Sequence, residues 1–240
     1  MQMKYLAPLL IFLCSVTSVA ADITVFAAAS LKEPLDQIAA EVGGVTVAYG
    51  GSGTLARQVS LGAPADVVIL ANDAWMDVLT EGGHVTGRVD LLSNTLVLVS
   101  REAKAVPLSA DGVLAALNGG RLAMGFVASV PAGIYGQAAF MDLGLWGAVS
   151  PHVAEVDNVR AALALVARGE APLGVVYATD ARVVPGMHVV ATFPSDSHPP
   201  IRYVGGLASQ SLEAAAFLTH LGSPKAQAIF AQAGFLPVVP

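Results

Sequence analysis

Short β-branched and apolar runs alternate with segments of helical periodicity along the chain from residue 22 onward. The first part of this pattern predicts strands at residues 23–28, 45–49 and 66–71, and helices at 30–42, 54–61 and 74–80. Glycines follow the second and third of these helices, where a helix commonly ends. Strands that alternate with helices predict a parallel or mixed sheet with helices on both faces.

The pattern then recurs with different residues. It predicts strands at residues 95–100, 121–126, 153–156, 173–177, 188–192 and 202–207, and helices at 113–117, 131–143, 159–168, 212–221 and 224–233. Residues 195–200, rich in Ser, His and Pro, are typical of a linker. Two clusters of roughly 100 residues each have the size of two lobes. The pattern alone leaves open which lobe takes the last strand and the last two helices.

The amino-terminal segment has the layout of a secretory signal peptide. Lys4 provides a positive start, residues 6–13 form a short apolar run, and Ser18, Ala20 and Ala21 are small residues suited to cleavage. We therefore predict a cleaved signal peptide over residues 1–21. The alternative, an uncleaved membrane anchor, is disfavoured because a spanning helix needs about 20 apolar residues.

Composition narrows the class of protein further. Hydrophobic residues make up 55% of the 240-residue chain and charged residues 12%, which provides a sizeable core and argues against disorder. The formal net charge is −6, and no cluster of Lys and Arg occurs, so we expect no nucleic-acid partner. Cys14 is the single cysteine and lies within the predicted signal peptide, so the mature chain is expected to have no disulfide.

Four predicted helices begin with residues suited to a helix N-terminus, and each of them follows a strand. Ser30 has Glu33 three residues later, which is a capping-box pattern. Ser52 lies within a Gly-Gly-Ser-Gly turn, Pro131 stands at a first helical position, and Asn158 is placed to cap the amphipathic helix that follows it. These helix starts are expected at the carboxyl edge of a sheet, where ligands bind in open α/β folds.

Converging helix starts favour an anion. Each offers free N–H groups and about half a positive charge, so four of them together present on the order of +2. The hydroxyls of Ser30 and Ser52, and the phenol of Tyr177 at a strand end, would add hydrogen-bond donors. The arrangement predicts a site for a dianion that uses no Lys or Arg. Taken singly, each serine also fits a plain helix cap, and Tyr177 fits a half-buried strand residue.

Other chemical motifs are weak in this sequence. Residues 51–56 fit the loose G-x-G-x-x-A dinucleotide pattern, but they follow the second strand and precede a short helix. No P-loop motif and no G-x-S-x-G nucleophile elbow occurs. The histidines show no metal-ligand spacing; they are His84, His152, His188, His198 and His220.

Several blocks of sequence coincide with these candidate residues. They are Val25-Phe-Ala-Ala-Ala-Ser30-Leu31, Gly51-Ser-Gly-Thr-Leu-Ala-Arg-Gln58, Gly62-Ala-Pro-Ala-Asp66, Val130-Pro-Ala-Gly-Ile-Tyr135, Val159-Arg-Ala-Ala-Leu-Ala-Leu-Val166, Ala171-Pro-Leu-Gly-Val-Val-Tyr177 and Val189-Val-Ala-Thr-Phe-Pro194. In these blocks, and over essentially the whole mature sequence, the chain resembles the periplasmic molybdate-binding proteins of ABC-type importers. It departs from them at residues 126–129, which are apolar where related chains are usually more polar and charged.

The resemblance implies a fold and a site. The fold is the two-lobed α/β architecture of type II periplasmic binding proteins, in which each lobe is a mixed sheet flanked by helices and the ligand lies in the cleft. Residues 22–98 and 201–240 would form lobe 1, and residues 99–200 would form lobe 2. The resemblance implies that molybdate or tungstate is held by side chains and main-chain groups of five residues: Ser30, Ser52, Ala132, Val159 and Tyr177. No cofactor is implied, and molybdenum would be bound only as the oxyanion.

The expected function is capture without chemistry. A periplasmic, monomeric binding protein would wrap the oxyanion in neutral donors and deliver it to a membrane permease with a cytoplasmic ATPase. Three alternatives stay open at this point. They are a binding protein for another oxyanion such as sulfate or phosphate, an α/β hydrolase with a base near one of the serines, and the ligand-sensing domain of a transcriptional regulator. The last would need a helix-turn-helix segment, and the chain instead begins with an export signal.

Overall fold

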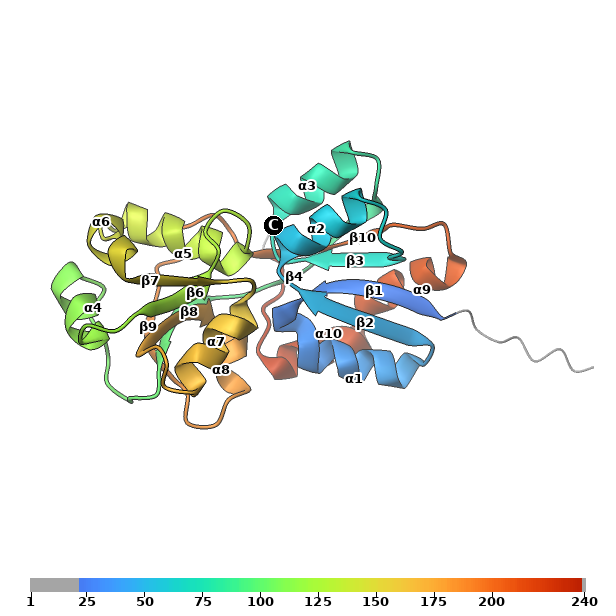
Figure 1. The fold of residues 1–240 in the computed structure, drawn as a ribbon. Coiled ribbons are helices and arrows are strands. Elements are labelled where there is room, and N and C mark those ends of the chain that lie inside the picture. The colour runs from blue at the N-terminus through green and yellow to red at the C-terminus, as the bar shows by residue number, and fades with distance from the viewer. Residues whose placement is uncertain (1–21, 239–240) are drawn as a thin grey trace, which may run out of the picture.

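A computed structural model describes residues 22–238. The predicted signal peptide, including Cys14, lies outside the described residues. Two mixed five-stranded sheets, each flanked by helices, form the two halves of the molecule seen in Figure 1. We call the half built on β1 the first lobe and the half built on β6 the second lobe. Among the described residues no helix is long and apolar enough to cross a membrane.

The first sheet has the order β2-β1-β3-β10-β4. Its strands are β1 (Ile23–Ala28), β2 (Val45–Gly50), β3 (Val67–Leu70), β4 (Thr86–Ser93) and β10 (Arg202–Leu207). β1 pairs in parallel with β2 and β3, whereas β10 is antiparallel to β3 and β4. The three parallel strands therefore end at the same edge, which faces the second lobe in Figure 1.

The second sheet repeats this arrangement in the order β7-β6-β8-β5-β9. Its strands are β5 (Leu96–Ser100), β6 (Leu122–Gly125), β7 (Val153–Val156), β8 (Leu173–Tyr177) and β9 (His188–Thr192). β6 pairs in parallel with β7 and β8, and β5 is antiparallel to β8 and β9. Each sheet thus has three adjacent parallel strands, then one antiparallel strand that arrives from the other lobe, and then an edge strand that is antiparallel to it.

The helices cover both faces of each sheet, as the alternating pattern predicts. They are η1 (Ala29–Leu31), α1 (Lys32–Val42), α2 (Ser52–Ser60), α3 (Asp73–Glu81), α4 (Ala110–Leu117), α5 (Pro131–Asp142), α6 (Trp146–Val149), η2 (Ser150–His152), α7 (Val159–Ala167), α8 (Ala178–Arg182), α9 (Leu212–Leu221) and α10 (Pro224–Ala233). In Figure 1, α2 and α3 lie on one face of the first sheet, and α1 and α10 lie on the other. In the second lobe α5 and α7 lie on opposite faces.

The chain crosses between the sheets twice. Residues 94–95 lead from β4 to β5, and residues 193–201 lead from β9 to β10. The lobe boundary expected at residue 98 falls inside β5, whose strand partners are both in the second sheet. Near the first crossing, Ser93 forms an isolated bridge with Leu236, so the last described residues lie against the connection between the lobes.

The sequence pattern missed two elements that lie beside the crossings or the cleft. β4 is an edge strand whose first five residues are exposed, so it lacks the apolar alternation that reveals a half-buried strand. α8 has five residues and directly follows β8, so it is too short to show helical periodicity. The short α6 and η2 were also not predicted, for the same reason.

Candidate functional site

A small cavity lies between the two sheets, where the segments after β1, β2 and β3 face those at the ends of β6, β7 and β8. Its lining is Ala28, Ala29, Ser30, Gly50, Gly51, Ser52, Ala71, Val130, Pro131, Ala132, Asn158, Val159 and Tyr177. All five residues predicted to hold a ligand are in this lining. The structure therefore brings together positions that the sequence distributes over both lobes.

Ser30 lies in the short 3-10 helix η1, between β1 and α1. Its side chain is buried, and its Oγ is hydrogen-bonded to the hydroxyl of Tyr203 at 2.8 Å. The predicted capping box of Ser30 with Glu33 is wrong, because α1 begins at Lys32 with Leu31 as its N-cap. Neither Ser30 nor Glu33 makes a capping hydrogen bond there, and the carboxylate of Glu33 points to the other lobe instead.

Ser52 is the first residue of α2, which begins at this serine and not at residue 54. Gly51 is the N-cap, and the Oγ of Ser52 accepts a hydrogen bond from the backbone N–H of Ala71 at 3.0 Å. A serine hydroxyl that accepts one bond still has its own proton to donate. Ser52 is therefore a donor that faces the cavity, held in place from the end of β3.

The second lobe provides two helix starts to the cavity. Pro131 is the first residue of α5, as predicted, and Ala132 follows it fully buried. Asn158 caps α7 by accepting the N–H of Ala161 at 2.9 Å, which confirms the predicted cap and leaves Val159 as the first helical residue. The N–H groups of the first helical turn have no acceptor within their own helix. The N–H groups of Ala132 and Val159 can therefore serve a ligand.

Tyr177 ends β8 and is buried. Among residues 22–238 its hydroxyl is the one buried side-chain polar atom without a hydrogen-bond partner. Burial raises the pKa of this phenol well above its ordinary value, so the group is a neutral donor. A buried hydroxyl left unpaired costs about 1–3 kcal/mol, and an acceptor on a ligand would remove that cost.

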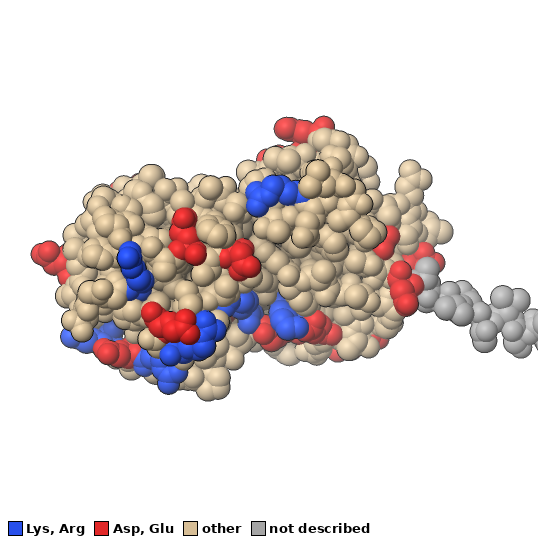
Figure 2. All heavy atoms as spheres, viewed as in Figure 1, with Lys and Arg blue, Asp and Glu red and all other residues tan. Residues whose placement is uncertain are grey.

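Most residues that line the cavity are small or apolar, none is charged, and the polar side chains among them are those of Ser30, Ser52, Asn158 and Tyr177. Its volume is about 10 Å³, which is about the space that one water molecule requires. On the face of the molecule drawn in Figure 2, Lys and Arg lie interspersed with Asp and Glu, without a continuous basic region. The formal net charge of −6 also does not attract an anion from a distance, so the attraction is expected to come from helix starts and hydroxyls close to the ligand.

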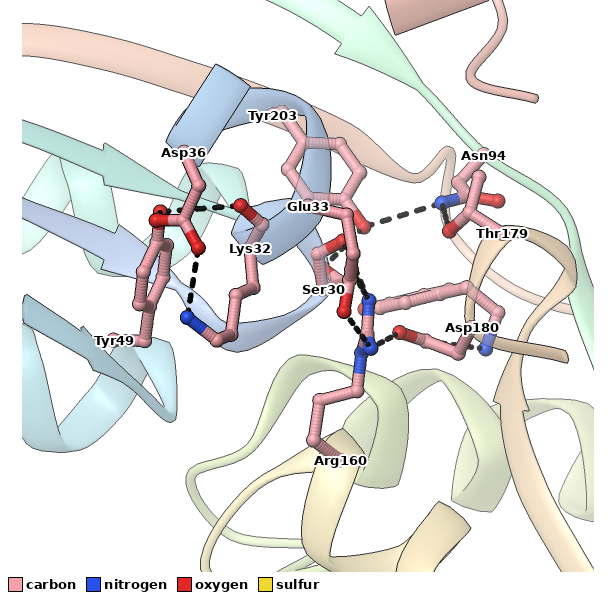
Figure 3. Close-up of polar contacts among 11 residues, drawn as sticks. Ser30, Lys32, Glu33, Asp36, Tyr49, Asn94, Arg160, Thr179, Asp180 and Tyr203 are labelled. Carbon is pink, nitrogen blue, oxygen red and sulfur yellow. Dashed lines mark hydrogen bonds and ion pairs between the residues drawn. The ribbon is translucent and has the colours of Figure 1, made fainter. Parts of the chain in front are cut away.

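A charged cluster beside the cavity joins the two lobes (Figure 3). Arg160, the second residue of α7, donates from Nε to Oδ1 of Asp180 at 2.6 Å and from its terminal nitrogens to the carboxylate of Glu33 in α1. Asp180 is fully buried and also accepts the backbone N–H of Tyr177 at 3.1 Å. Burial raises the pKa of Asp180 to about 6, although the Arg160 guanidinium lowers it. Arg160 thus links a carboxylate of each lobe.

A second polar network reaches Ser30 from the first crossing between the lobes (Figure 3). Asn94, in the segment between β4 and β5, donates from Nδ2 to the hydroxyl oxygen of Thr179 at 2.8 Å and to that of Tyr203 at 3.3 Å. Its Oδ1 accepts the backbone N–H of Thr95 at 2.9 Å. Tyr203, in β10, completes the network through its bond to Ser30.

The lobes also meet directly at the cavity wall. Asn72, which caps α3, donates to the hydroxyl of Tyr135 in α5 at 3.1 Å, and Tyr135 donates to the carbonyl of Ala71 at 3.2 Å. At Gly51 a Cβ atom would lie 2.3 Å from the carbonyl oxygen of Asp157 in the second lobe. Backbone approaches backbone here, so the structure is that of closed lobes.

The sequence did not single out these supporting residues. Tyr203 and Asn94 lie 173 and 109 positions from their respective partners Ser30 and Tyr203. Arg160 is 127 positions from Glu33. A helical arginine and a strand tyrosine carry no local signal of such contacts, so the sequence pattern could not have found them.

No group of three or more His, Cys, Asp or Glu side chains within residues 22–238 is arranged to hold a metal ion. His198 lies in the second crossing, where its ring centroid is 5.9 Å from that of Tyr135. Neither cavity serine contacts a general base: Ser30 Oγ meets a phenol and Ser52 Oγ meets a backbone N–H in the described structure. The arrangement can bind and desolvate an anion, and it lacks the paired base of an activated serine.

Two mixed sheets with an uncharged cavity between them, lined by a few hydroxyls and helix starts, define a solute-binding protein of the two-lobed class. The chain belongs to the bacterial extracellular solute-binding protein family, whose sequence profile matches residues 23–236. This match and the relatives described next confirm the predicted α/β fold and the resemblance noted in the sequence.

Two curated relatives and one solved structure are similar over almost the whole chain. The molybdate-binding protein ModA of Escherichia coli (strain K12) is 43% identical over 226 residues, covering 89% of this chain and 88% of the relative. The molybdate-binding protein ModA of Haemophilus influenzae is 37% identical over 228 residues, covering 90% of each chain. The periplasmic molybdate-binding protein of Azotobacter vinelandii has a TM-score of 0.77 and 26% identity, covering 91% of this chain and 99% of that one.

Proposed function

We propose that this chain is the extracytoplasmic substrate-binding component of an ABC importer and that it captures molybdate, with tungstate as a second ligand. The observation that carries this proposal is the cavity between the lobes, lined by uncharged donors that include the unpaired hydroxyl of Tyr177. The names of the Escherichia coli and Haemophilus influenzae relatives support molybdate as the ligand.

The proposed site consists of the five predicted residues. The hydroxyls of Ser30, Ser52 and Tyr177 and the main-chain N–H groups of Ala132 and Val159 donate to the oxygens of the anion. Donors alone suit a fully deprotonated dianion, because such a ligand offers acceptors on every side. Molybdenum is bound as an oxyanion and not as a cation, and no cofactor is needed.

Binding and transport follow from the placement of these donors. Ser30 and Ser52 belong to the first lobe and the other three residues to the second, so a ligand that engages all five favours closed lobes. A membrane permease with its cytoplasmic ATPase then receives the ion from the closed protein. The extents of the lobes, residues 22–98 with 201–240 and residues 99–200, stay a prediction, as do export through residues 1–21 to the periplasm and the monomeric state.

Two alternatives are less well supported. Sulfate is a dianion of the same shape but smaller, so it leaves long hydrogen bonds to donors placed for molybdate, which is costly for buried groups. A serine hydrolase needs a base beside its nucleophile. The described contacts of Ser30 and Ser52 include no such base, which supports a binding protein that is not an enzyme.

Ligand-dependent thermal stability tests the proposed function. We expect molybdate and tungstate to raise the melting temperature of the purified protein, because a ligand at 100 times its Kd stabilises by about 2.7 kcal/mol. Sulfate at the same concentration should give a much smaller shift, and phosphate, which carries a proton near neutral pH, should give none. The proposal is wrong if neither molybdate nor tungstate changes the melting temperature.

Tyr177→Phe tests the site with opposite effects on binding and stability. The substitution removes a buried hydroxyl that has no described partner, so the ligand-free protein should be as stable as the wild type or more stable by up to about 1 kcal/mol. Molybdate binding should weaken by roughly tenfold, because a hydrogen bond to a charged group is lost. Calorimetric titration and ligand-free melting measure the two effects.

The control for Tyr177→Phe is Tyr49→Phe, at a partly exposed tyrosine whose hydroxyl donates to Asp36 on the surface of the first lobe. This variant should bind molybdate like the wild type. Unchanged affinity in Tyr177→Phe would remove that residue from the proposed site.

A further inference from the structure

The hydroxyl of Ser30 lies between two possible partners, the phenol of Tyr203 and the cavity. A serine hydroxyl has one proton, so Ser30 can donate either to Tyr203 or to a ligand. Only the second orientation lets it hold an oxyanion. The surrounding hydrogen bonds decide between the two orientations.

The amide of Asn94 is oriented by its neighbours. Its Oδ1 accepts the N–H of Thr95, a donor that the amide nitrogen could not accept from. The Nδ2 atom must therefore face the other side, where its two protons go to Thr179 Oγ1 and Tyr203 Oη. The oxygen and both N–H groups of this amide therefore have assigned partners. Asn94 is buried, so water does not compete for these bonds.

The direction of the next bond follows. Tyr203 Oη accepts a hydrogen bond from Asn94. Within residues 22–238 the remaining partner of this hydroxyl is Ser30 Oγ at 2.8 Å. Tyr203 is fully buried, and burial raises the pKa of its phenol, so its proton stays in place and is donated to Ser30. Ser30 then accepts from Tyr203, and its own proton is directed away from Tyr203 and toward the cavity.

We propose that Tyr203 and Asn94 are positioning residues that commit the Ser30 hydroxyl to donate into the ligand cavity. This inference rests on the proposed function and deepens it, because it makes the direction of hydrogen bonds a determinant of ligand choice. Ser52 Oγ likewise accepts a hydrogen bond, from the N–H of Ala71, so its own proton is also available to a ligand. The hydroxyl of Tyr177 has no described protein acceptor. With the protons of all three hydroxyls directed into the cavity, the site favours fully deprotonated oxyanions, which offer acceptors on every side.

The network also joins the two lobes. Asn94 lies in the segment that joins the lobes, Tyr203 lies in the first lobe, and Thr179 lies in α8 of the second lobe. The amide therefore bonds to both lobes at the point where the chain crosses between them. Of these two bonds, the one to Tyr203 passes the orientation of the amide on to Ser30, so loss of the bond to Thr179 leaves the Ser30 proton directed at the cavity.

A double-mutant cycle between Tyr203 and Ser30 tests the proposal. We expect Tyr203→Phe to weaken molybdate binding by roughly tenfold, because Ser30 loses the bond that directs its proton. In a Ser30→Ala background the same substitution should change the Kd by less than about twofold, because Tyr203 acts through the Ser30 hydroxyl. Calorimetric titration of the four purified proteins gives the Kd values, and melting-temperature shifts at high molybdate extend the range to weak binding.

Controls separate this role from general damage. The phenyl ring introduced by Tyr203→Phe would keep the edge contacts that Tyr203 makes with Tyr177 and Phe235, so the variant should fold. Thr179→Val removes the other acceptor of the same Asn94 amide and leaves the bond between Tyr203 and Ser30 intact, so its Kd should stay within about twofold of the wild type.

The outcomes are distinct. A loss on Tyr203→Phe that is equally large with and without the Ser30 hydroxyl would overturn the proposal, because Tyr203 would then act through packing. A loss for Thr179→Val as large as that for Tyr203→Phe would overturn it as well. Failure of the wild type to bind molybdate would instead count against the proposed function.

Discussion

Gly51→Ala should weaken molybdate binding by roughly 100-fold while leaving the ligand-free protein folded. The added Cβ would lie 2.3 Å from the carbonyl oxygen of Asp157 and 3.3 Å from a methyl group of Val130, both in the second lobe. Forcing an extra carbon into a close-packed contact costs typically about 1–3 kcal/mol, and 3 kcal/mol corresponds to a factor of roughly 100 in Kd. Because the clash exists only with the lobes closed, its cost falls on binding. Calorimetric titration with molybdate measures it.

The backbone of Gly51 makes this a clean substitution. Its φ of −69° is accessible to alanine, so no backbone strain is introduced in the open protein. Gly53 is a poorer choice, because a Cβ there would press on Trp75 of its own lobe as well as on Ser129. Gly147→Ala is the matched control, since a Cβ at that helical position meets no atom within 4 Å. Binding by Gly51→Ala at wild-type affinity would mean that the lobes need not approach this closely.

The general fold could be predicted from the sequence because its signals are local. Strands such as β1 and β8 are short apolar runs bounded by turn residues, and α7 is an amphipathic helix with a capping asparagine. The elements that were missed, β4 and α8, owe their structure to neighbours. β4 is held by its pairing with β10, a strand more than 100 residues later. Because β4 is an exposed edge strand, its residues show no alternation of apolar and polar positions that would predict a strand.

The residues of the candidate site also differ in whether local sequence signals or distant contacts position them. Helix starts are set by local chemistry, so Pro131 and Asn158 indicate Ala132 and Val159, which the structure places in the cavity lining. At Ser30 the prediction of a capping box was wrong, because its hydroxyl is hydrogen-bonded to Tyr203, which lies 173 positions later in the chain. Position near a helix start nevertheless placed Ser30 at the cavity.

Neutral donors in the cavity and charges beside it have different roles. A Lys or Arg among the ligands would hold a dianion by charge alone and would accept many anions. Here Arg160, beside the cavity, is held by Asp180 and Glu33, so its charge is neutralised by carboxylates of both lobes. In the proposed site the ligand would contact only hydrogen-bond donors of fixed direction, which distinguish anions by size and protonation.

Arg160→Met should destabilise the ligand-free protein by about 3 kcal/mol at pH 7.5, because it leaves Asp180 as a buried carboxylate without a counter-charge. The pKa of Asp180 is already raised to about 6 by burial, and loss of the guanidinium raises it further. In the unfolded chain an aspartate titrates near pH 3.9. Between that pH and the folded pKa the native state binds more protons than the unfolded state, so stability falls as pH rises through this window. The defect should therefore shrink at pH 5, as measured by urea unfolding.

Two further variants identify Asp180 as the cause of that pH dependence. Asp180→Asn in the Arg160→Met background removes the buried charge, so it should recover most of the lost stability and flatten the pH profile. Arg168→Met is the matched control at the end of the same helix, because Arg168 pairs with Glu170 on the surface, with side chains 57% and 54% exposed, and solvent screens such a pair. A defect of Arg160→Met that is equal at pH 5 and pH 7.5 would place its origin in the lost contact with Glu33.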